Sequence, residues 1–377
     1  MKKLNLYIIA WPCIHFAGAE RWWYYVLKEI REMDINITLL IPTGLKLGCF
    51  KCPQELMGEN LIVKYVPLTR DIKGILKGFS TILREAKHAD IIVSGYQTPL
   101  ITLLSALTGV LTAKKCFVMF HMPLGWIPYY QQIDISLRNK LLILLYKLIN
   151  IKCKFIMVSP SVLYDHKRIR FEPKNVTSLS GAAVELPLHV QYMKPKDRKY
   201  DVIYLASISR AKGALDVPQI LKYLQDSIGR IKAIIVGRIS NDLRNELENE
   251  LMKLNIRDNV EVMGYVDETL KFELLRSSKV MIYPSYIDTF AISVLEALTV
   301  GTPVVAYSIP AISVNYRTEA VRKVPIGDMK GMAEEVAKLL RDNSLLNYLS
   351  MEAINFAKKF TWRRIAIEFL RALTSTS

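Results

Sequence analysis

Residues 283–310 read YPSYIDTFAISVLEALTVGTPVVAYSIP. This pattern predicts the end of a buried strand, a helix over about residues 290–300 and a second buried strand over 303–307. Asp288 lies in the loop that enters the helix, and Glu296 lies about two turns inside it. Because the rest of this helix is almost wholly apolar, we expect Glu296 to be satisfied by a group other than bulk water.

The start of the same helix is a predicted anion site. Its first backbone N–H groups and the positive end of its dipole both favour negative charge. A carboxylate that binds hydroxyls, beside a helix end that binds phosphate, is the minimum needed to hold a ribose phosphate. The stretch therefore predicts a nucleotide site.

Apolar runs alternate with amphipathic segments along the whole chain of 377 residues. The strand candidates are residues 4–10, 36–41, 61–66, 90–94, 115–120 and 154–158, then 202–206, 231–236, 260–263, 280–283 and 303–307. The helix candidates of the first series are residues 19–33, 72–88, 99–107 and 136–149. Continuous apolarity predicts parallel sheets covered on both faces. We therefore expect an α/β fold of two doubly wound, Rossmann-like domains, joined near residue 195.

Two segments imitate membrane signals. Residues 1–19 have a basic start and an apolar run, as a signal peptide does, but the following loop and helix favour a first buried strand. Residues 91–113 carry no charge. Gly95, Pro99 and Gly109 break this run into a short strand and a short helix, so we expect no transmembrane helix.

The net charge of +16 is concentrated in the first half of the chain. Residues 1–190 carry 24 Lys and Arg against 13 Asp and Glu, whereas residues 191–377 carry 27 against 22. The excess indicates an anionic partner, and a membrane surface or a lipid phosphate fits it. Nucleic acid is excluded as the expected partner because no nucleic-acid-binding motif is visible.

The five cysteines are odd in number and scattered: Cys13, Cys49, Cys52, Cys116 and Cys153. This pattern is more typical of a reducing compartment than of a disulfide framework. Cys49 and Cys52 form a C-x-x-C, but without a second pair they favour ordinary loop cysteines over a metal or redox site. We expect no metal site.

Ligands collect at the carboxyl ends of strands in such sheets. His15 and Gly18 follow the first strand, and Gly18 would let the backbone approach a ligand. In the same position after later strands come His121, Ser207, Arg210, Lys212 and Arg238. Because both domains carry such residues, we expect a cleft between them.

Several motifs together resemble those of the retaining glycosyltransferases of family 4. These are GAER at 18–21, Lys212-Gly213, Gly264-Tyr265-Val266, the two acids and following strand at 288–307, and Phe360-Thr361-Trp362. The resemblance covers nearly the whole chain and implies the GT-B architecture, two facing Rossmann-like domains. It implies an N-terminal acceptor-binding domain at 1–195, completed by a C-terminal helix at 361–377, and a nucleotide-sugar-binding domain at 196–360.

The family pattern also implies roles for individual residues. Glu296 would bind the ribose hydroxyls and Asp288 those of the transferred sugar. The backbone amides of Ala291 and Ile292 would hold the phosphates. The remaining contacts to the donor would come from Lys212 at the diphosphate, His121 at the sugar, and Tyr265 and Val266 at the base.

The chain departs from the family pattern at three places. Asp288 stands where Glu is commoner, and Thr289 and Ala291 replace glycines. Ser207 stands where an arginine is expected, and we expect Arg210 or Arg238 to supply the missing guanidinium.

The implied reaction is transfer of a hexose, of mannose or glucose type, from a nucleotide diphosphate sugar with retention at the anomeric carbon. No Asp-x-Asp pair occurs in the chain, so we expect no metal requirement and no cofactor. The implied acceptor is lipid-linked or a glycan, at the cytoplasmic face of the cell membrane. Two alternative functions stay open. Ser207 is compatible with a catalytically inactive partner subunit that binds a nucleotide sugar, and the basic charge is compatible with a peripheral membrane protein with a vestigial site.

The candidate residues for acceptor and membrane each have two interpretations. Trp126, Tyr129 and Tyr130, followed by basic positions, fit either ordinary packing or an interfacial patch for a lipid-linked acceptor. Those basic positions are Arg138, Lys140, Lys147, Lys152 and Lys154. His15 fits the acceptor site and a structural role equally well. Without the family pattern, His121 would be interpreted as a core histidine.

Overall fold

A computed structural model describes residues 3–11, 18–45, 54–124, 128–131 and 136–375. The chain forms two compact units. The first unit comprises Met1–Trp126, Ile133–Ala182 and Trp362–Ser377, and the second comprises Ile127–Gln132 and Ala183–Thr361. The main boundary between the two units falls after Ala182, whereas we expected it near residue 195.

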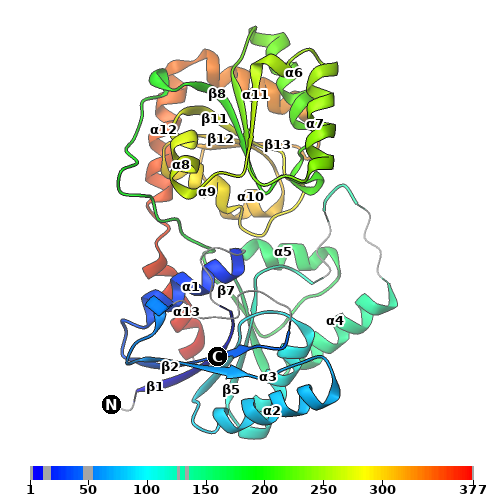
Figure 1. Cartoon of the computed structure of the whole chain (residues 1–377), viewed down its shortest axis with the longest axis vertical. Coiled ribbons are helices and arrows are strands. Elements are labelled where there is room, and N and C mark those ends of the chain that lie inside the picture. The colour runs from blue at the N-terminus through cyan, green and yellow to red at the C-terminus, as the bar shows by residue number, and fades with distance from the viewer. Residues whose placement is uncertain (1–2, 12–17, 46–53, 125–127, 132–135, 376–377) are drawn as a thin grey trace. The chain divides into compact units, whose positions relative to one another are not determined.

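The first unit is built on a parallel sheet of seven strands (Figure 1). The spatial order is β3-β2-β1-β4-β5-β6-β7. The strands are β1 (Leu4–Ile9), β2 (Ile35–Pro42), β3 (Leu61–Val66), β4 (Ile91–Ser94), β5 (Lys115–Phe120), β6 (Cys153–Met157) and β7 (Val176–Ser178). Strand β1 lies between β2 and β4, with Ile8 opposite both Leu39 and Val93. The expectation of a first buried strand is therefore confirmed.

Helices connect these strands on both faces of the sheet. They are α1 (Gly18–Ile30), α2 (Ile72–Ala86), α3 (Pro99–Thr112), α4 (Leu137–Asn150) and α5 (Pro160–Arg168), with a 3-10 turn η1 (Gln54–Leu56). Right-handed crossovers put α1 on one face and α2 to α5 on the other, because the strand order reverses between β1 and β4. The last helix, α13 (Trp362–Thr374), packs on α1 within this unit.

The charge-free run of residues 91–113 forms β4 and α3, as expected. In the part of the chain that the structure describes, no helix is long and apolar enough to cross a membrane.

The second unit has a parallel sheet of six strands in the order β10-β9-β8-β11-β12-β13. The strands are β8 (Tyr200–Leu205), β9 (Ala233–Val236), β10 (Val260–Gly264), β11 (Ser278–Tyr283), β12 (Val304–Tyr307) and β13 (Val321–Val324). The helices are α6 (Val217–Ile228), α7 (Asn241–Lys253), α8 (Glu268–Arg276), α9 (Ile292–Thr299), α10 (Pro310–Asn315), α11 (Met329–Arg341) and α12 (Asn343–Ala357). Three 3-10 turns complete the unit, η2 (Pro195–Asp197), η3 (Arg210–Lys212) and η4 (Arg257–Asn259). In both sheets the strand order reverses at the first strand, so each unit is doubly wound, as expected.

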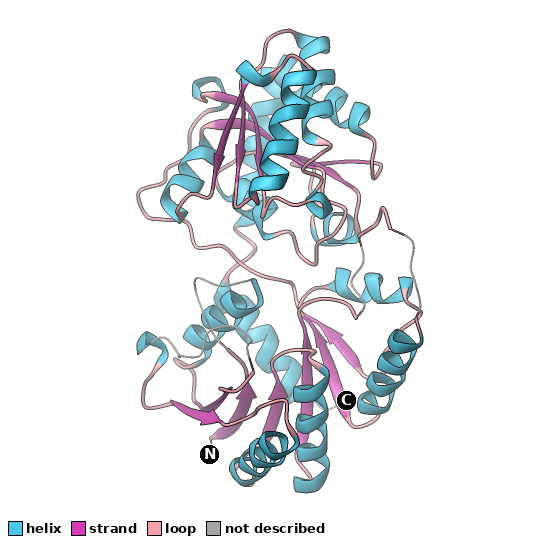
Figure 2. Ribbon diagram, turned by 45° about the vertical axis from the view of Figure 1, so that its right-hand side comes forward, coloured by secondary structure: helices cyan, strands magenta, loops and turns pink. Residues whose placement is uncertain are grey.

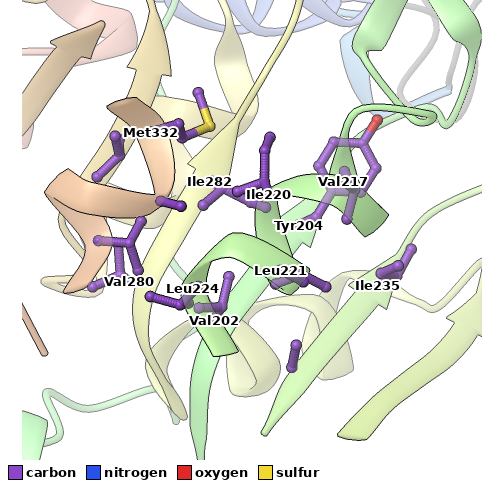
Figure 3. Close-up of a cluster of buried hydrophobic side chains, with 14 of the residues drawn as sticks. Val202, Tyr204, Val217, Ile220, Leu221, Leu224, Ile235, Val280, Ile282 and Met332 are labelled. Carbon is purple, nitrogen blue, oxygen red and sulfur yellow. The ribbon is translucent and has the colours of Figure 1, made fainter. Parts of the chain in front are cut away.

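The core of the second unit lies between the sheet and the helices α6 and α11. Val202, Ile235 and Ile282 from three strands meet Leu221 and Met332 from these helices, and each side chain is essentially excluded from solvent (Figure 3). Burial of this apolar surface is the main force that fixes the strand ends, and with them the loops that carry polar residues.

Two details differ from the expectations. The short strands β7 and β13 were missed because they are only three and four residues long and partly polar. The cysteines are not all unpaired, since Cys116 of β5 and Cys153 of β6 form a disulfide between register partners of neighbouring strands. Cys13, Cys49 and Cys52 lie outside the described residues.

Candidate active site

The loop between β11 and α9 folds around the carboxylate of Asp288. One oxygen, Oδ1, accepts hydrogen bonds from the amides of Thr289 at 2.7 Å and Ala291 at 2.8 Å. Ala291 has a left-handed backbone with φ of 61°, so α9 begins at Ile292. The expected helix start at residue 290 is therefore wrong, because Asp288 turns these amides inward before the helix begins.

The other carboxylate oxygen of Asp288 is held by two side chains. Lys212 Nζ donates to Asp288 Oδ2 at 2.5 Å and to the carbonyl of Ile287 at 2.8 Å. The hydroxyl of Tyr283, the last residue of β11, also donates to Asp288 Oδ2. Each side chain of the ion pair is 18% exposed. The pair is thus mostly desolvated and fixed in geometry.

A glycine lets Lys212 reach this position. Gly213 has φ of +73°, and a Cβ there would lie 2.0 Å from the carbonyl oxygen of Pro284. The adjoining backbone is tied to the same strand end, since the amide of Tyr286 donates to the carbonyl of Ala211 at 2.9 Å. The turn η3 therefore packs backbone to backbone against the end of β11, which only glycine permits.

Asp288 is ionised in this arrangement. Burial alone would raise the pKa of its carboxyl, but the Lys212 ammonium and the hydrogen bonds from Lys212, Tyr283 and Ala291 together hold the pKa below its usual range. The Asp288 carboxylate is thus the anion that the loop amides bind. The amide of Ala291, which we expected to face a phosphate, donates to Asp288 instead.

Glu296 lies inside α9, 5% exposed, and is paired with a lysine that the sequence reading missed. Lys271 Nζ of α8 donates to Glu296 Oε1 at 2.7 Å. Both side chains are largely buried, at 12% and 6% exposure. The expectation that a group other than bulk water satisfies Glu296 is confirmed. The signal was an acid in an apolar helix, which requires a cation from a neighbouring element such as α8.

Candidate donor-binding residues gather at the carboxyl ends of β8, β9 and β10. The Arg238 guanidinium lies 5.4 Å from the centre of the Tyr265 ring, which is 70% exposed. The amide of Ile208, next to Ser207, donates to the carbonyl of Arg238 at 2.9 Å. This edge thus brings an exposed arginine, a flat aromatic ring and the exposed Ser207 close together, and Val266 follows the ring directly.

Arg210, the other expected substitute for the missing arginine, faces elsewhere. Its guanidinium is paired with Glu246 of α7 at 2.5 Å on the exposed surface. Arg238 is therefore the better placed of the two.

Tyr129 and Tyr130 belong to the second unit, not to the domain in which we expected them. The amide of Tyr129 donates to the carbonyl of Tyr286 at 2.9 Å, and the Tyr130 ring packs edge-on against the Tyr286 ring. Asp216, which sequence reasoning missed, accepts hydrogen bonds from the hydroxyls of Tyr286 and Tyr307. The expected patch is therefore divided, because the basic residues from Arg138 onwards lie in the first unit.

His121 lies at the end of β5 in the first unit, packed edge-on against Trp22 and Trp23 and tilted against Tyr96. Burial lowers the pKa of His121 to about 3, and a hydrogen bond with the backbone of Gly95 only partly opposes this shift. The imidazole is therefore neutral at physiological pH. Gly18 is the exposed first residue of α1, whereas His15 and Trp126 lie outside the described residues.

Within the described ranges, no group of three or more His, Cys, Asp or Glu residues could hold a metal ion.

A family model matches the second half of the chain, curated relatives match parts of it, and solved structures match its overall fold. Residues 189–356 match the family model of glycosyl transferases group 1. A curated relative, 2-deoxystreptamine N-acetyl-D-glucosaminyltransferase of Niallia circulans, is 22% identical over 217 residues, which are 55% of each chain. Phosphatidyl-myo-inositol mannosyltransferase of Mycolicibacterium smegmatis is 28% identical over 149 residues, 39% of this chain and 37% of that enzyme. The chain spans about half the length, or less, of the curated relatives it matches.

Solved structures match over nearly the full length. HepE of Anabaena, in complex with UDP, superposes with a TM-score of 0.77 at 16% identity, covering 99% of this chain and all of that one. Sucrose-phosphate synthase of Thermosynechococcus elongatus gives a TM-score of 0.76 at 14% identity, with 98% of each chain covered. These likenesses, with two doubly wound parallel sheets in one chain, assign the GT-B fold. Residues 189–356, which carry the two-acid motif, match the group 1 glycosyl transferases.

Proposed function

We propose that this protein is a retaining, metal-independent glycosyltransferase. It moves a hexose, of mannose or glucose type, from a nucleotide diphosphate sugar to a lipid-linked or glycan acceptor at the cytoplasmic face of the cell membrane. The observation that carries the proposal is the paired arrangement in the second unit: Asp288 fixed by Lys212, and Glu296 fixed by Lys271.

The donor would bind along the carboxyl edge of the second sheet. Glu296 forms an ion pair with the largely buried Lys271, and its carboxylate offers oxygens that would accept from the ribose hydroxyls. The Tyr265 ring and Val266 offer a surface for the base, with Arg238 beside them. A relative of the same fold has been crystallised with UDP and with UDP-glucose, which supports this class of donor.

Lys212 would act on the departing diphosphate. Its ammonium is already desolvated beside Asp288, and such a fixed cation stabilises developing negative charge better than a solvated one. When a phosphate binds Lys212, the Asp288 carboxylate would accept hydrogen bonds from the sugar hydroxyls in place of the one from Lys212. His121, neutral and buried at a strand end of the first unit, would contact the sugar as a hydrogen-bonding partner and not as a cation.

The domain assignment follows from the same reading. We propose that the first unit binds the acceptor and that the second unit binds the nucleotide sugar. The proposed location at the cytoplasmic face is supported by the basic charge of the first half of the chain alone. The cysteines do not support it, because Cys116 and Cys153 are paired.

Slow hydrolysis of nucleotide sugars tests the proposal. A panel of donors is first ranked by the rise in thermal stability that each causes. The best donor is then turned over in EDTA by the wild type and by Glu296→Gln, which keeps the shape of the side chain. We expect hydrolysis by the wild type with retention, and its loss in the variant at unchanged fold. Strict dependence on a divalent metal would contradict the metal-independent mechanism.

Ser207 favours one second candidate, a catalytically inactive partner subunit that binds a nucleotide sugar. In that function the donor still raises thermal stability, but no hydrolysis occurs with any sugar or acceptor. The third reading, a peripheral membrane protein with a vestigial site, predicts no stabilisation by any nucleotide sugar. The same panel therefore separates all three functions.

A further inference from the structure

Helix α4 of the first unit carries a row of exposed apolar side chains. Leu137, Leu141, Leu144 and Leu148, with Ile151 directly after the helix, are 53% to 72% exposed. Their spacing alternates between four and three residues, so they form one continuous stripe along the helix. We call these five residues the α4 stripe.

The opposite side of the same helix already packs on the unit. Tyr146, Ile149 and Asn150 are buried. An apolar stripe is therefore not needed to attach α4 to the sheet. A water-soluble surface rarely exposes this many large apolar side chains in one row, and such rows mark interaction sites.

Basic side chains border the α4 stripe on both sides. At 100° per residue, Lys140 and Lys147 fall on one flank, and Arg138 and Lys152 fall on the other. All four are exposed. The helix contains no acidic residue, and residues 91–164 contain only one, Asp134, against seven Lys and Arg.

The neighbouring helix α3 repeats the pattern. Leu107, Val110 and Leu111 are exposed at its C-terminal half, and Lys114 and Lys115 follow them. Helices α3 and α4 pack beside each other on the same face of the sheet. In both views α4 lies on the outside of the first unit (Figures 1 and 2).

We propose that the α4 stripe inserts into the surface of an anionic lipid bilayer, with its flanking lysines and arginine at the lipid phosphates. The proposal rests on the membrane-linked acceptor proposed above and names the surface that would hold the enzyme there. Apolar side chains at this spacing, bordered by cations, are the features of a helix that lies in the plane of a membrane interface. Attraction to anionic lipid adds to the burial of the leucines.

Charge decides between a bilayer and a second copy of this chain. The alternating spacing also fits a coiled-coil seam. A dimer through α4, however, would bring the flanking cations of the two copies together without any acid on the helix to compensate. Such like-charge contacts oppose pairing, whereas an anionic surface is favoured by every one of these residues.

Vesicle flotation tests the proposal. The wild-type protein is floated with vesicles of phosphatidylcholine, and of phosphatidylcholine mixed with phosphatidylglycerol, at low and high salt. We expect binding to the anionic vesicles, weaker at high salt. The variant Leu144→Asn/Leu148→Asn should bind roughly tenfold or more weakly for each leucine replaced, and Lys140→Ala/Lys147→Ala roughly fivefold more weakly for each lysine.

Matched controls come from the second unit. Met252 of α7 is 57% exposed, so Met252→Asn should leave flotation unchanged, as should replacement of the exposed Lys338 of α11 by alanine. Nucleotide-sugar hydrolysis without vesicles should be the same in all these variants and in the wild type. Flotation without hydrolysis would refute the proposed function but keep this inference, whereas hydrolysis without flotation would do the reverse.

Three further results would overturn the inference. The first is flotation of both double variants at the wild-type level. The second is equal binding to vesicles with and without phosphatidylglycerol. The third is a wild-type dimer in sedimentation that Leu144→Asn/Leu148→Asn converts to a monomer, which would assign the α4 stripe to a second copy.

Discussion

The two units bury polar groups in opposite ways. In the first unit, His121 and His166 are buried among aromatic rings and stay neutral, because burial lowers the pKa of each to about 3. In the second unit, charges are buried as pairs, Lys212 with Asp288 and Lys271 with Glu296.

Arg198 is a further buried charge of the second unit, held by neutral hydrogen-bond acceptors and not by an acid. It is 4% exposed, and its guanidinium donates to the carbonyls of Met193, Ser278 and Gly301 and to two hydroxyls. Burial lowers the pKa of Arg198 to about 10, so it remains charged at neutral pH. The second unit thus keeps fixed charges inside, whereas no Lys or Arg among the described residues of the first unit is buried, and four of these cations border the α4 stripe.

The largest expected effect comes from breaking a buried pair. In Lys271→Met, Glu296 stays buried without its cation, which should destabilise the second unit by about 3–5 kcal/mol. In Lys253→Met, the pair with Glu250 is exposed, so the loss should be below about 1 kcal/mol. Unfolding in urea, followed by far-UV circular dichroism, measures both.

The tryptophans make this test specific to one unit. All five, Trp11, Trp22, Trp23, Trp126 and Trp362, belong to the first unit. Tryptophan emission should therefore keep its wild-type midpoint in Lys271→Met while the circular dichroism transition moves to lower urea. Equal losses in the two lysine variants would remove the distinction drawn between buried and exposed pairs.

The second prediction concerns the chemistry of the same unit. In Lys212→Met, loss of the desolvated ammonium should lower kcat for nucleotide-sugar hydrolysis roughly 10²–10³-fold. Lys222→Met serves as the control, because Lys222 pairs with Asp226 on the exposed surface of α6. If Lys212→Met turns over the donor like the control, Lys212 has no role at the diphosphate.

The sequence predicted the second unit better than the first. Continuous apolar runs at residues 280–283 and 303–307 identified β11 and β12, and an acid in an apolar helix identified Glu296 as a residue with a partner. The identity of that partner, Lys271, could not be predicted, because any cation on an adjacent element would satisfy the same carboxylate. The helix start was misplaced for a related reason, since the fold of Asp288 onto its own loop is a local competition that periodicity does not record.

The first unit shows where sequence patterns are ambiguous. A run of basic residues after an aromatic run was one expected patch, yet Tyr129 and Tyr130 pack on Tyr286 of the second unit. The α4 stripe was invisible in the sequence, because leucines at helical spacing normally face a core. Only the burial of Tyr146 and Ile149 shows that the core face is the other one.

The third prediction concerns acid sensitivity of the first unit. The pKa of His166 is about 3 in the folded protein and near 6.5 when unfolded. Between these values the unfolded chain binds more protons, so stability is lost as pH falls below about 6.5. Between pH 7 and pH 5 the expected loss is roughly 2 kcal/mol for this histidine.

Tryptophan emission during urea unfolding at the two pH values measures this loss in the first unit. His166→Gln keeps a hydrogen-bond acceptor for the amide of Leu124, which donates to His166 Nε2 at 3.0 Å. The variant should therefore lose less stability than the wild type between pH 7 and pH 5. An unchanged pH dependence would mean that His166 does not remain neutral in the folded unit.

The smallest expected effect distinguishes the two arginines near Ser207. Arg238 lies over the exposed ring of Tyr265, whereas Arg210 is engaged by Glu246. If Arg238 supplies the missing guanidinium, Arg238→Ala should raise the Kd of a nucleoside diphosphate by roughly two- to fivefold, the range of an exposed cation–π contact. Arg210→Ala should change it less. Titration calorimetry with UDP and GDP measures both, and Arg238→Lys helps to separate charge from stacking, because lysine keeps the cation but lacks the planar group. If Arg238→Ala binds as tightly as the wild type while Arg210→Ala does not, the exposed ion pair with Glu246 opens on binding, and the arginine expected at Ser207 is replaced from η3 and not from the loop after β9.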